Sequence, residues 1–166
     1  MRSIWMHVYN FFSAVLPSQA CGVRRYLLLF AGIRVPASVS VAHRVYFYGN
    51  SVRLGENVWF SPGCRLHSGY IDGKQDLIVI KDSCDFGPDV LLCCGSHKIG
   101  PASRRAGRGF SGHIEVGEGV WVGANATILG GAIIGAGSIV AAGSVVLAGE
   151  YPANCLLAGN PARVKK

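Results

Sequence analysis

Acidic residues are the scarcest class in this chain. Asp and Glu number 9 against 16 Lys and Arg, and charged residues make up only 15% of 166 residues, whereas half are apolar. This composition excludes a disordered chain and indicates one domain with a core. The net charge of +7 suits a phosphorylated cofactor, an anionic glycan or a membrane surface, although an ordinary basic protein explains it equally well. Nucleic acid is not expected, because no DNA-binding motif or basic–aromatic interleaving occurs.

Cysteines with metal-ligand spacing are missing. The chain has six cysteines but no CxxC pair, so no metal site is predicted. Cys64 and Cys84 fall on the small-residue position of the repeat described below, which indicates packing residues. Thiols without a disulfide framework predict a reducing, cytoplasmic location.

Long apolar runs are also missing. Two helical patterns occur within residues 1–40, but neither reaches the ~20 residues of a membrane span, and the start does not read as a signal peptide. We expect these helices to pack on the end of the fold or at a subunit interface. The alternative is a contact with the inner face of the membrane through an apolar helix face beside two arginines. That face and its arginines are Ile4, Trp5, Val8, Phe11, Phe12, Val15, Arg24 and Arg25.

The stretch from Val116 to Leu147 is a repeat with a period of six residues. Branched aliphatic residues occupy the first position: Val116, Val122, Ile128, Ile134, Val140 and Val146. A second series follows four residues later: Val120, Ala126, Ala132, Ser138 and Ser144. Neither a helix nor a simple amphipathic strand has this period. Short strands separated by glycine-rich corners do, and stacked coils would bury every sixth side chain.

The sequence here resembles the hexapeptide-repeat acyltransferases, in their sugar- and polysaccharide-modifying branch. The resemblance rests on VGEGVWVGANATILGGAIIGAGSIVAAGSVV and the closing LLAGNPARVKK, and it extends over about Val41 to Lys166. It implies a mainly β fold, a left-handed parallel β-helix with about three hexapeptides per turn. The handedness comes from the resemblance alone, because the general crossover rule would predict a right-handed connection.

The repeat divides the chain into three parts. We expect a helical segment at 1–40, the β-helix at 41–150 and a tail at 151–166. A looser six-residue pattern precedes the regular one: Val41, Phe47, Leu54, Phe60, Leu66, Ile80, Phe86 and Leu92, with Val58, Cys64, Cys84, Val90 and Ser96 as the second series. It breaks at His67–Asp76 and at Lys98–Gly112, which we expect to leave the coils as a polar loop and an arginine-rich loop. After Val146 the chain is expected to leave the coils through Pro152.

His97 is the candidate catalytic residue. It lies in CCGSHKIG, at the expected end of a strand and directly before the arginine-rich loop, among residues that predict a surface position. Acyl transfer to a hydroxyl needs a base that is neutral near physiological pH, and imidazole supplies one. The resemblance implies that His97 removes the acceptor's proton so that the hydroxyl attacks the thioester of acetyl-CoA directly.

The cofactor expectation is acetyl-CoA, whose phosphates need cations or backbone N–H groups. The tail offers Arg163 and Lys166, which match basic family positions for the coenzyme. The resemblance also implies that the small Ala124 and Ala142 line the coenzyme groove and that Trp121 lies beside the site. A threonine–lysine pair found in some relatives is replaced here by Leu147 and Ala148, which shifts the expected phosphate contacts to the tail.

The acceptor site departs from the family pattern. Ser61 stands where sugar acetyltransferases carry an asparagine, and only Asp72 or Asp76 can replace their acceptor-binding aspartate. His113 opens the strand after the arginine-rich loop and is a third acceptor-site candidate, and His67 is near the first break.

The predicted function is therefore acetyl-CoA-dependent O-acetylation of a sugar hydroxyl in polysaccharide or lipopolysaccharide biosynthesis, by a homotrimer whose site lies between subunits. Two alternatives remain open: an N-acetyltransferase of an amino-sugar nucleotide, and a non-catalytic, membrane-associated scaffold. An ice-binding solenoid is disfavoured because it needs rows of threonine, and Thr127 is the only threonine in the chain.

Overall fold

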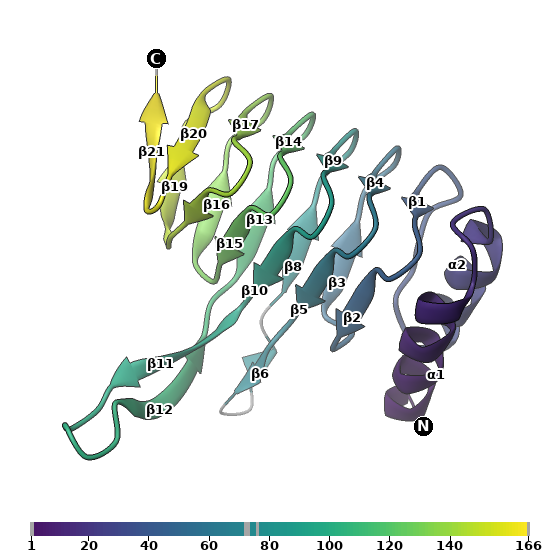
Figure 1. Cartoon of the computed structure of the whole chain (residues 1–166), viewed down its shortest axis with the longest axis horizontal. Helices are drawn as coiled ribbons and strands as arrows, with labels where there is room; N and C mark the ends of the chain where they lie inside the picture. The colour runs from purple at the N-terminus through teal and green to yellow at the C-terminus, as the bar shows by residue number, and fades with distance from the viewer. Residues whose placement is uncertain (1, 72–73, 76, 166) are drawn as a thin grey trace.

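The chain folds into a three-sided stack of coils with two helices at its N-terminal end (Figure 1). The computed structural model describes residues 2–71, 74–75 and 77–165. The helices are α1 (Arg2–Val15) and α2 (Cys21–Phe30). Sheet A contains β1 (Ser40–Val41), β4 (Trp59–Phe60), β9 (Asp85–Phe86), β14 (Trp121–Val122), β17 (Ile139–Val140), β20 (Leu156–Gly159) and β21 (Ala162–Lys165).

Two further sheets complete the walls of each coil. Sheet B contains β2 (Tyr46–Tyr48), β5 (Arg65–His67), β10 (Leu91–Cys93), β15 (Thr127–Leu129) and β18 (Val145–Val146). Sheet C contains β3 (Val52–Leu54), β8 (Ile78–Ile80), β13 (Ile114–Val116), β16 (Ala132–Ile134) and β19 (Gly149–Tyr151). Two antiparallel hairpins lie outside the walls: β6 (Tyr70–Ile71) with β7 (Lys74–Gln75), and β11 (Gly95–Ile99) with β12 (Ala106–Ser111).

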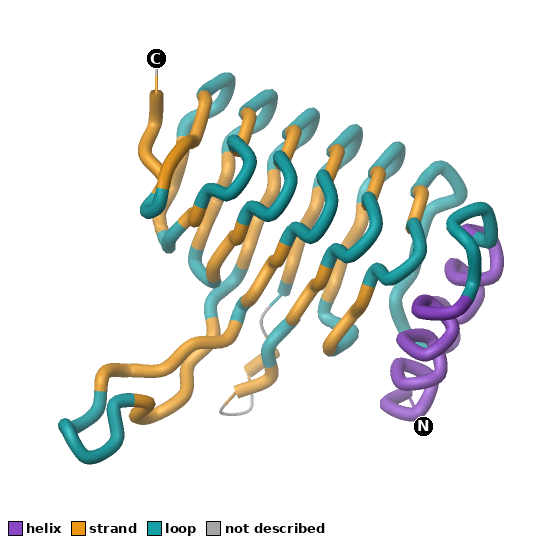
Figure 2. Tube along the Cα trace, viewed as in Figure 1, coloured by secondary structure: helices purple, strands orange, loops and turns teal. Residues whose placement is uncertain are grey.

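The walls are built from parallel pairing between successive coils. Leu92 pairs with Leu66 in the preceding coil and with Ile128 in the next one. The chain runs from sheet A to sheet B to sheet C and then begins the next coil, as the corner loops in Figure 2 show. We name the three edges between the sheets the A–B corner, the B–C corner and the C–A corner.

The repeat predicted from the sequence forms the core. All six aliphatic residues from Val116 to Val146 are buried, and so are their five small partners from Val120 to Ser144. Each buried Val or Ile stabilises the fold by about 1.5–3 kcal/mol relative to an exposed one. Towards the N-terminus the core becomes aromatic, and the rings of Phe60 and Phe86 stack with centroids 4.9 Å apart.

Three expectations about the irregular segments are corrected. Ser96 is exposed in β11, and Cys94 takes the buried position expected for it. The arginine-rich segment is an ordered antiparallel hairpin that projects from the B–C corner rather than an irregular loop. The chain also does not leave the coils through Pro152, because β20 continues sheet A beside β17 and β21 folds back on β20.

The first helix is oriented opposite to the expectation from its apolar face. Tyr9, Asn10 and Ser13 face the coils, whereas Phe11 and Val15 are exposed. The reason is that β2 is the edge strand of sheet B, whose backbone groups need partners. The Tyr9 and Ser13 hydroxyls each donate to the carbonyl of Val45 at 2.8 Å. The Asn10 amide donates to the carbonyl of Phe47 at 2.9 Å and accepts from its N–H at 3.1 Å.

Arg24 does not accompany the exposed apolar face, as the sequence suggested, but is fully buried. Its guanidinium donates to the carbonyls of Leu16, of Pro17 at 2.9 Å and of Ser18 at 3.3 Å, directly after the end of α1. A cation is favoured there because the carbonyl end of a helix is partly negative. Arg24 therefore fastens α2 to the end of α1.

Neither helix is long and apolar enough to cross a membrane, within the residues that the structure describes. Across the same residues, no group of three His, Cys, Asp or Glu side chains gathers as metal ligands.

The buried cysteines should resist thiol reagents in the folded protein, whereas the half-buried Cys93 and Cys155 should react. Burial raises the pKa of the Cys64 thiol to about 12 and that of Cys84 to about 11, so almost no reactive thiolate forms near neutral pH. Iodoacetamide labelling followed by mass spectrometry, with and without denaturant, measures this. Equal labelling rates for Cys64 and Cys93 in the native protein would contradict the packing.

Candidate active site

His97 lies within β11 of the projecting hairpin, and not at the end of a wall strand as expected (Figure 1). Its antiparallel partner in β12 is Gly109. A glycine opposite the histidine leaves the space beside the imidazole open, and the His97 side chain is exposed. The residue is therefore accessible to a substrate at the B–C corner.

The hairpin backbone fixes the tautomer of His97. The imidazole Nδ1 lies 2.9 Å from the carbonyl oxygen of Gly107. A carbonyl oxygen only accepts hydrogen bonds, so Nδ1 carries the proton in this contact and the neutral ring keeps a free lone pair on Nε2. A Cβ on Gly107 would lie 2.8 Å from the carbonyl oxygen of Lys98, so only glycine lets the two strands approach this closely. No pattern in the sequence indicates this role of Gly107.

Tyr48 and His67 form an aromatic surface at the same corner. Their rings stack with centroids 4.2 Å apart, and Tyr48 is exposed. The His67 carbonyl accepts a hydrogen bond of 3.0 Å from the N–H of Cys94, at the base of the hairpin. Burial, with a smaller contribution from Arg65, lowers the pKa of His67, so this ring stays neutral at physiological pH. The sequence pattern indicates His67, beside the first break in the repeat, but not Tyr48.

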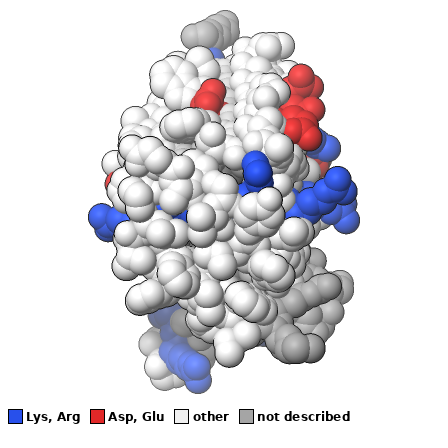
Figure 3. All heavy atoms as spheres, turned by 90° about the vertical axis from the view of Figure 1, so that its right-hand side faces the viewer, with Lys and Arg blue, Asp and Glu red and all other residues white. Residues whose placement is uncertain are grey.

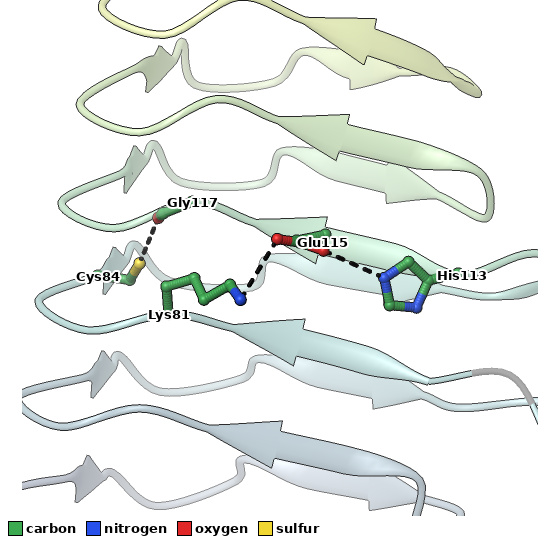
Figure 4. A network of polar contacts seen from close by, with 5 residues as sticks. All are labelled: Lys81, Cys84, His113, Glu115 and Gly117. Atoms are coloured by element: carbon green, nitrogen blue, oxygen red, sulfur yellow. Dashed lines mark hydrogen bonds and ion pairs between the residues drawn. The ribbon is translucent and has the colours of Figure 1, made fainter.

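His113 lies where the chain returns from the hairpin to sheet C, and it points to Glu115 (Figure 4). Its Nε2 is 3.5 Å from one carboxylate oxygen of Glu115, and Lys81 Nζ is 3.5 Å from the other. His113 thus shares the B–C corner with His97 but is held in a polar network on the outside of sheet C.

The candidate cofactor residues lie along a different edge. Ala124 and Ala142 belong to the A–B corner of successive coils, where the N–H of Gly143 bonds to the carbonyl of Ala124 at 2.8 Å. Arg163 continues this edge, because it pairs with Ala158 at the C-terminal end of sheet A. Trp121 is exposed on the adjoining face of sheet A. Four of the five sequence candidates therefore form one strip along the coils, and the fifth, Lys166, lies outside the described residues.

Within one chain, His97 and the cofactor strip are on opposite edges of sheet B. The hairpin leaves at the B–C corner after β10, whereas Ala124 and Ala142 precede β15 and β18 at the A–B corner. Ser61 follows β4 and also lies at the A–B corner. Within one chain, Ser61 therefore lies on the opposite edge of sheet B from His97. Asp72 and Asp76 lie outside the described residues. The candidate base and the candidate donor residues thus lie on two different edges of the coil.

The family model for the bacterial transferase hexapeptide (six repeats) matches residues 113–148, the segment in which the coils are most regular. The chain belongs to the hexapeptide-repeat acyltransferase family. It is 42% identical to nodulation protein L of Rhizobium leguminosarum bv. viciae over 71% of this chain and 58% of that protein. It is 31% identical to galactoside O-acetyltransferase of Lactococcus lactis over 72% of this chain and 56% of that protein.

Solved structures of this hexapeptide-repeat family have the same fold. A hexapeptide-repeat acetyltransferase from Vibrio cholerae O1 biovar eltor, solved with acetyl coenzyme A, matches 98% of this chain and 84% of its own at a TM-score of 0.76 and 26% identity. The expected left-handed parallel β-helix is thereby confirmed. The chain spans 58% and 56% of the length of the two curated relatives described above.

Proposed function

We propose that this protein is an acetyl-CoA-dependent O-acetyltransferase that modifies a sugar hydroxyl in polysaccharide or lipopolysaccharide biosynthesis. The observation that carries the proposal is the exposed His97 ring, whose Nδ1 lies 2.9 Å from the Gly107 carbonyl oxygen, so that Nε2 is the nitrogen left to act as a base. That arrangement is what a general base needs. The names of the relatives, two of them acetyltransferases, support the reaction class.

In the proposed reaction, His97 Nε2 accepts the proton of the acceptor hydroxyl. The hydroxyl oxygen forms a bond to the acetyl carbonyl carbon, the carbon–sulfur bond of the thioester breaks, and the proton on Nε2 passes to the leaving sulfur. The hydrogen bond to Gly107 holds the ring in one orientation and stabilises the imidazolium that forms transiently. Acetyl-CoA supplies the activated acyl group.

The A–B corner offers small side chains and a cation that suit the proposed donor. Its small side chains, Ala124 and Ala142, let a pantetheine arm approach the backbone, and Arg163 supplies a cation for the phosphates at one end. Trp121 offers an exposed ring face beside the same strip. Lys166 is proposed as a second phosphate contact.

We propose a homotrimer because the site is incomplete in one chain. His97 lies at the B–C corner and the donor strip at the A–B corner, so a neighbouring copy must bring one to the other. Cyclic packing of identical coils is a common route to such shared sites. A monomeric mass by light scattering at micromolar concentration would contradict this.

The acceptor is proposed to contact Ser61, His113 and Asp72 in addition to His97. The direct test of function is titration calorimetry with acetyl-CoA, followed by an acceptor panel that compares hydroxyl-only sugars with amino sugars. Saturable binding near one per subunit and transfer to hydroxyls support the proposal. Transfer only to free amines would favour the N-acetyltransferase alternative, and a folded trimer without acetyl-CoA binding would favour the scaffold.

Arg163→Ala should weaken acetyl-CoA binding by about 10- to 150-fold, because one charge-assisted phosphate contact contributes about 1.5–3 kcal/mol. Titration calorimetry at low and moderate salt measures the dissociation constant, and the salt dependence should become shallower. The matched control is Arg53→Ala, an exposed arginine on sheet C. If acceptor affinity falls instead, the tail contacts the acceptor and not acetyl-CoA.

We also propose that the protein is cytoplasmic and contacts the inner face of the membrane through α1 and α2. Among the described residues, nine of the 18 exposed large apolar side chains lie in these helices: Ile4, Trp5, Phe11, Phe12, Val15, Val23, Tyr26, Leu29 and Phe30. The first 55 residues contain six arginines and no Asp or Glu. In the view onto the end with the helices, the Asp and Glu side chains among the described residues appear in the upper half (Figure 3). An apolar face on a segment without acidic residues suits an anionic bilayer.

Flotation with phosphatidylglycerol vesicles tests the contact, with phosphatidylcholine vesicles as the comparison. The wild-type protein should float with the anionic vesicles, and Phe11→Ser with Phe12→Ser should remain in the soluble fraction. Trp59→Ser, which removes an exposed aromatic residue from sheet A, should float like the wild type. Equal recovery of the wild type and the double variant would refute the contact.

A further inference from the structure

The projecting hairpin is strongly cationic. Residues 90–114 contain no Asp or Glu, whereas the hairpin and its turn carry Lys98, Arg104, Arg105 and Arg108. All four side chains are exposed. The hairpin extends away from the coils (Figure 2). A cluster of one sign on a projecting element creates a local positive potential that attracts anions.

The turn that carries Arg104 and Arg105 is ordered. The N–H of Gly100 bonds to the carbonyl of Arg105 at 2.9 Å, and the N–H of Arg104 bonds to the carbonyl of Pro101 at 3.0 Å. The Arg105 guanidinium also donates to the carbonyl of Gly100 at 3.3 Å. These hydrogen bonds therefore fix the backbone of the turn that places the two consecutive arginines at the tip of the hairpin.

Three of these cations, Lys98, Arg104 and Arg105, have no carboxylate partner within the described part of the chain. Lys98 lies over the ring of Phe110, 4.6 Å from its centroid, and among the described residues neither it nor Arg104 nor Arg105 pairs with a carboxylate. Neighbouring like charges repel each other. A bound anion would remove that repulsion, which makes the tip suited to an anionic ligand.

The spacing relates this anion site to His97. Ile99 pairs with Ala106 in the last pair of the hairpin ladder, and Arg105 lies one residue beyond that pair towards the tip. His97 lies two residues before Ile99 in β11. At roughly 3.3 Å per residue, the backbone of Arg105 lies about 10 Å from that of His97. A separation of this size lets one extended oligosaccharide reach both residues. An anion held by the tip would thus belong to the group next to the sugar at His97.

We propose that the acceptor is an anionic glycan, whose charged group binds Arg104 and Arg105 while the neighbouring sugar presents its hydroxyl to His97. The binding of the charged group does not depend on the proposed acetyl transfer. Only the presentation of the sugar hydroxyl to His97 rests on the proposed function. A carboxylate of an acidic sugar and a phosphate on a sugar share the chemistry that the tip recognises, because both accept paired hydrogen bonds from guanidinium groups.

The test compares binding of charged and neutral glycans without relying on turnover. Titration calorimetry uses a uronic-acid oligosaccharide and its carboxyl-reduced form as one pair, and a hexose 1-phosphate and the free hexose as the other. The wild-type protein should bind at least one charged member about tenfold or more tightly than its neutral partner. Arg104→Gln with Arg105→Gln should remove most of that preference, whereas Arg44→Gln with Arg53→Gln, in exposed positions on the first coils, should retain it.

The outcomes separate this inference from the proposed function. Equal binding of both members of both pairs by the wild type overturns the inference even if acetyl-CoA binds. Weakened acetyl-CoA binding, or a changed oligomeric mass, in the tip variant with unchanged glycan binding also overturns it, because the arginines then serve the donor or a neighbouring copy. If the tip arginines determine a preference for charged glycans but acetyl-CoA does not bind, the anion site is supported and the proposed acetyltransferase activity is contradicted. The pair that shows the preference identifies carboxylate or phosphate.

Discussion

Replacing His97 with asparagine is expected to reduce the turnover number by about 10²–10⁴-fold, the usual cost of removing a general base. Asparagine can still donate a hydrogen bond to the Gly107 carbonyl, which His97 contacts at 2.9 Å, but its side chain has no basic nitrogen. The fold should not change, because the side chain is exposed and lies on a hairpin outside the core. Steady-state kinetics with a sugar acceptor that the wild-type protein acetylates measures the turnover number.

Two controls show whether the loss of turnover is specific to the proposed base. Acetyl-CoA affinity should be nearly the same in His97→Asn, because the substitution leaves the proposed phosphate contact of Arg163 in place. His7→Asn, an exposed histidine on α1, should have normal turnover. If His97→Asn retains near-normal turnover with an intact fold, His97 is not the base, and His113 at the same corner becomes the next candidate.

The regular part of the fold was predictable because burial repeats with the sequence. From Val116 to Val146, each coil uses the same aliphatic and small positions, so the period alone identifies the buried set. Prediction failed where the period is interrupted. Directly before the hairpin, both Cys94 and Ser96 are small enough for the inner position, and only the place where the chain leaves the coil decides that Cys94 is buried.

The orientation of α1 was not predictable from its apolar periodicity. The usual assumption is that the apolar face of a helix packs inward. Here the helix covers an edge strand, whose backbone groups require hydrogen bonds more than apolar contacts. Tyr9, Asn10 and Ser13 satisfy β2 and its approach, so the apolar face is left outside. That requirement is tertiary and leaves no separate signal in the helix sequence.

The sequence indicates candidate site residues but not how they are arranged. Sequence resemblance singled out His97 and the strip that ends at Arg163, and both occupy corners of the coil. Their separation by sheet B follows from where each interruption falls within a coil. The hydrogen bond from His97 to Gly107 joins two strands across a turn, and nothing in the local sequence indicates which carbonyl a histidine will contact.

Arg24→Ala is expected to destabilise the helical end of the protein by about 3–5 kcal/mol, through a cavity and the loss of charge-assisted hydrogen bonds to buried carbonyls. Arg24 is fully buried and donates to the carbonyls of Leu16, Pro17 and Ser18. The adjacent Arg25 provides the matched control, since it is partly exposed and makes a single hydrogen bond of 2.9 Å to the carbonyl of Ala37. Arg25→Ala should cost less than about 1 kcal/mol.

Hydrogen–deuterium exchange locates the effect, and urea unfolding measures its size. In Arg24→Ala, amides of α1 and α2 should exchange much faster, whereas those of β13 to β18 should be unchanged, because coils in a solenoid depend mainly on their neighbours. The amides of β2 should then also exchange faster, because Tyr9 and Asn10 of α1 form hydrogen bonds with the backbone at the edge of sheet B. Equal protection of both helices in Arg24→Ala and Arg25→Ala would mean that α1 is held by its contacts with β2 alone. The apolar face of the helices would then be oriented by the coil edge and not by the buried arginine.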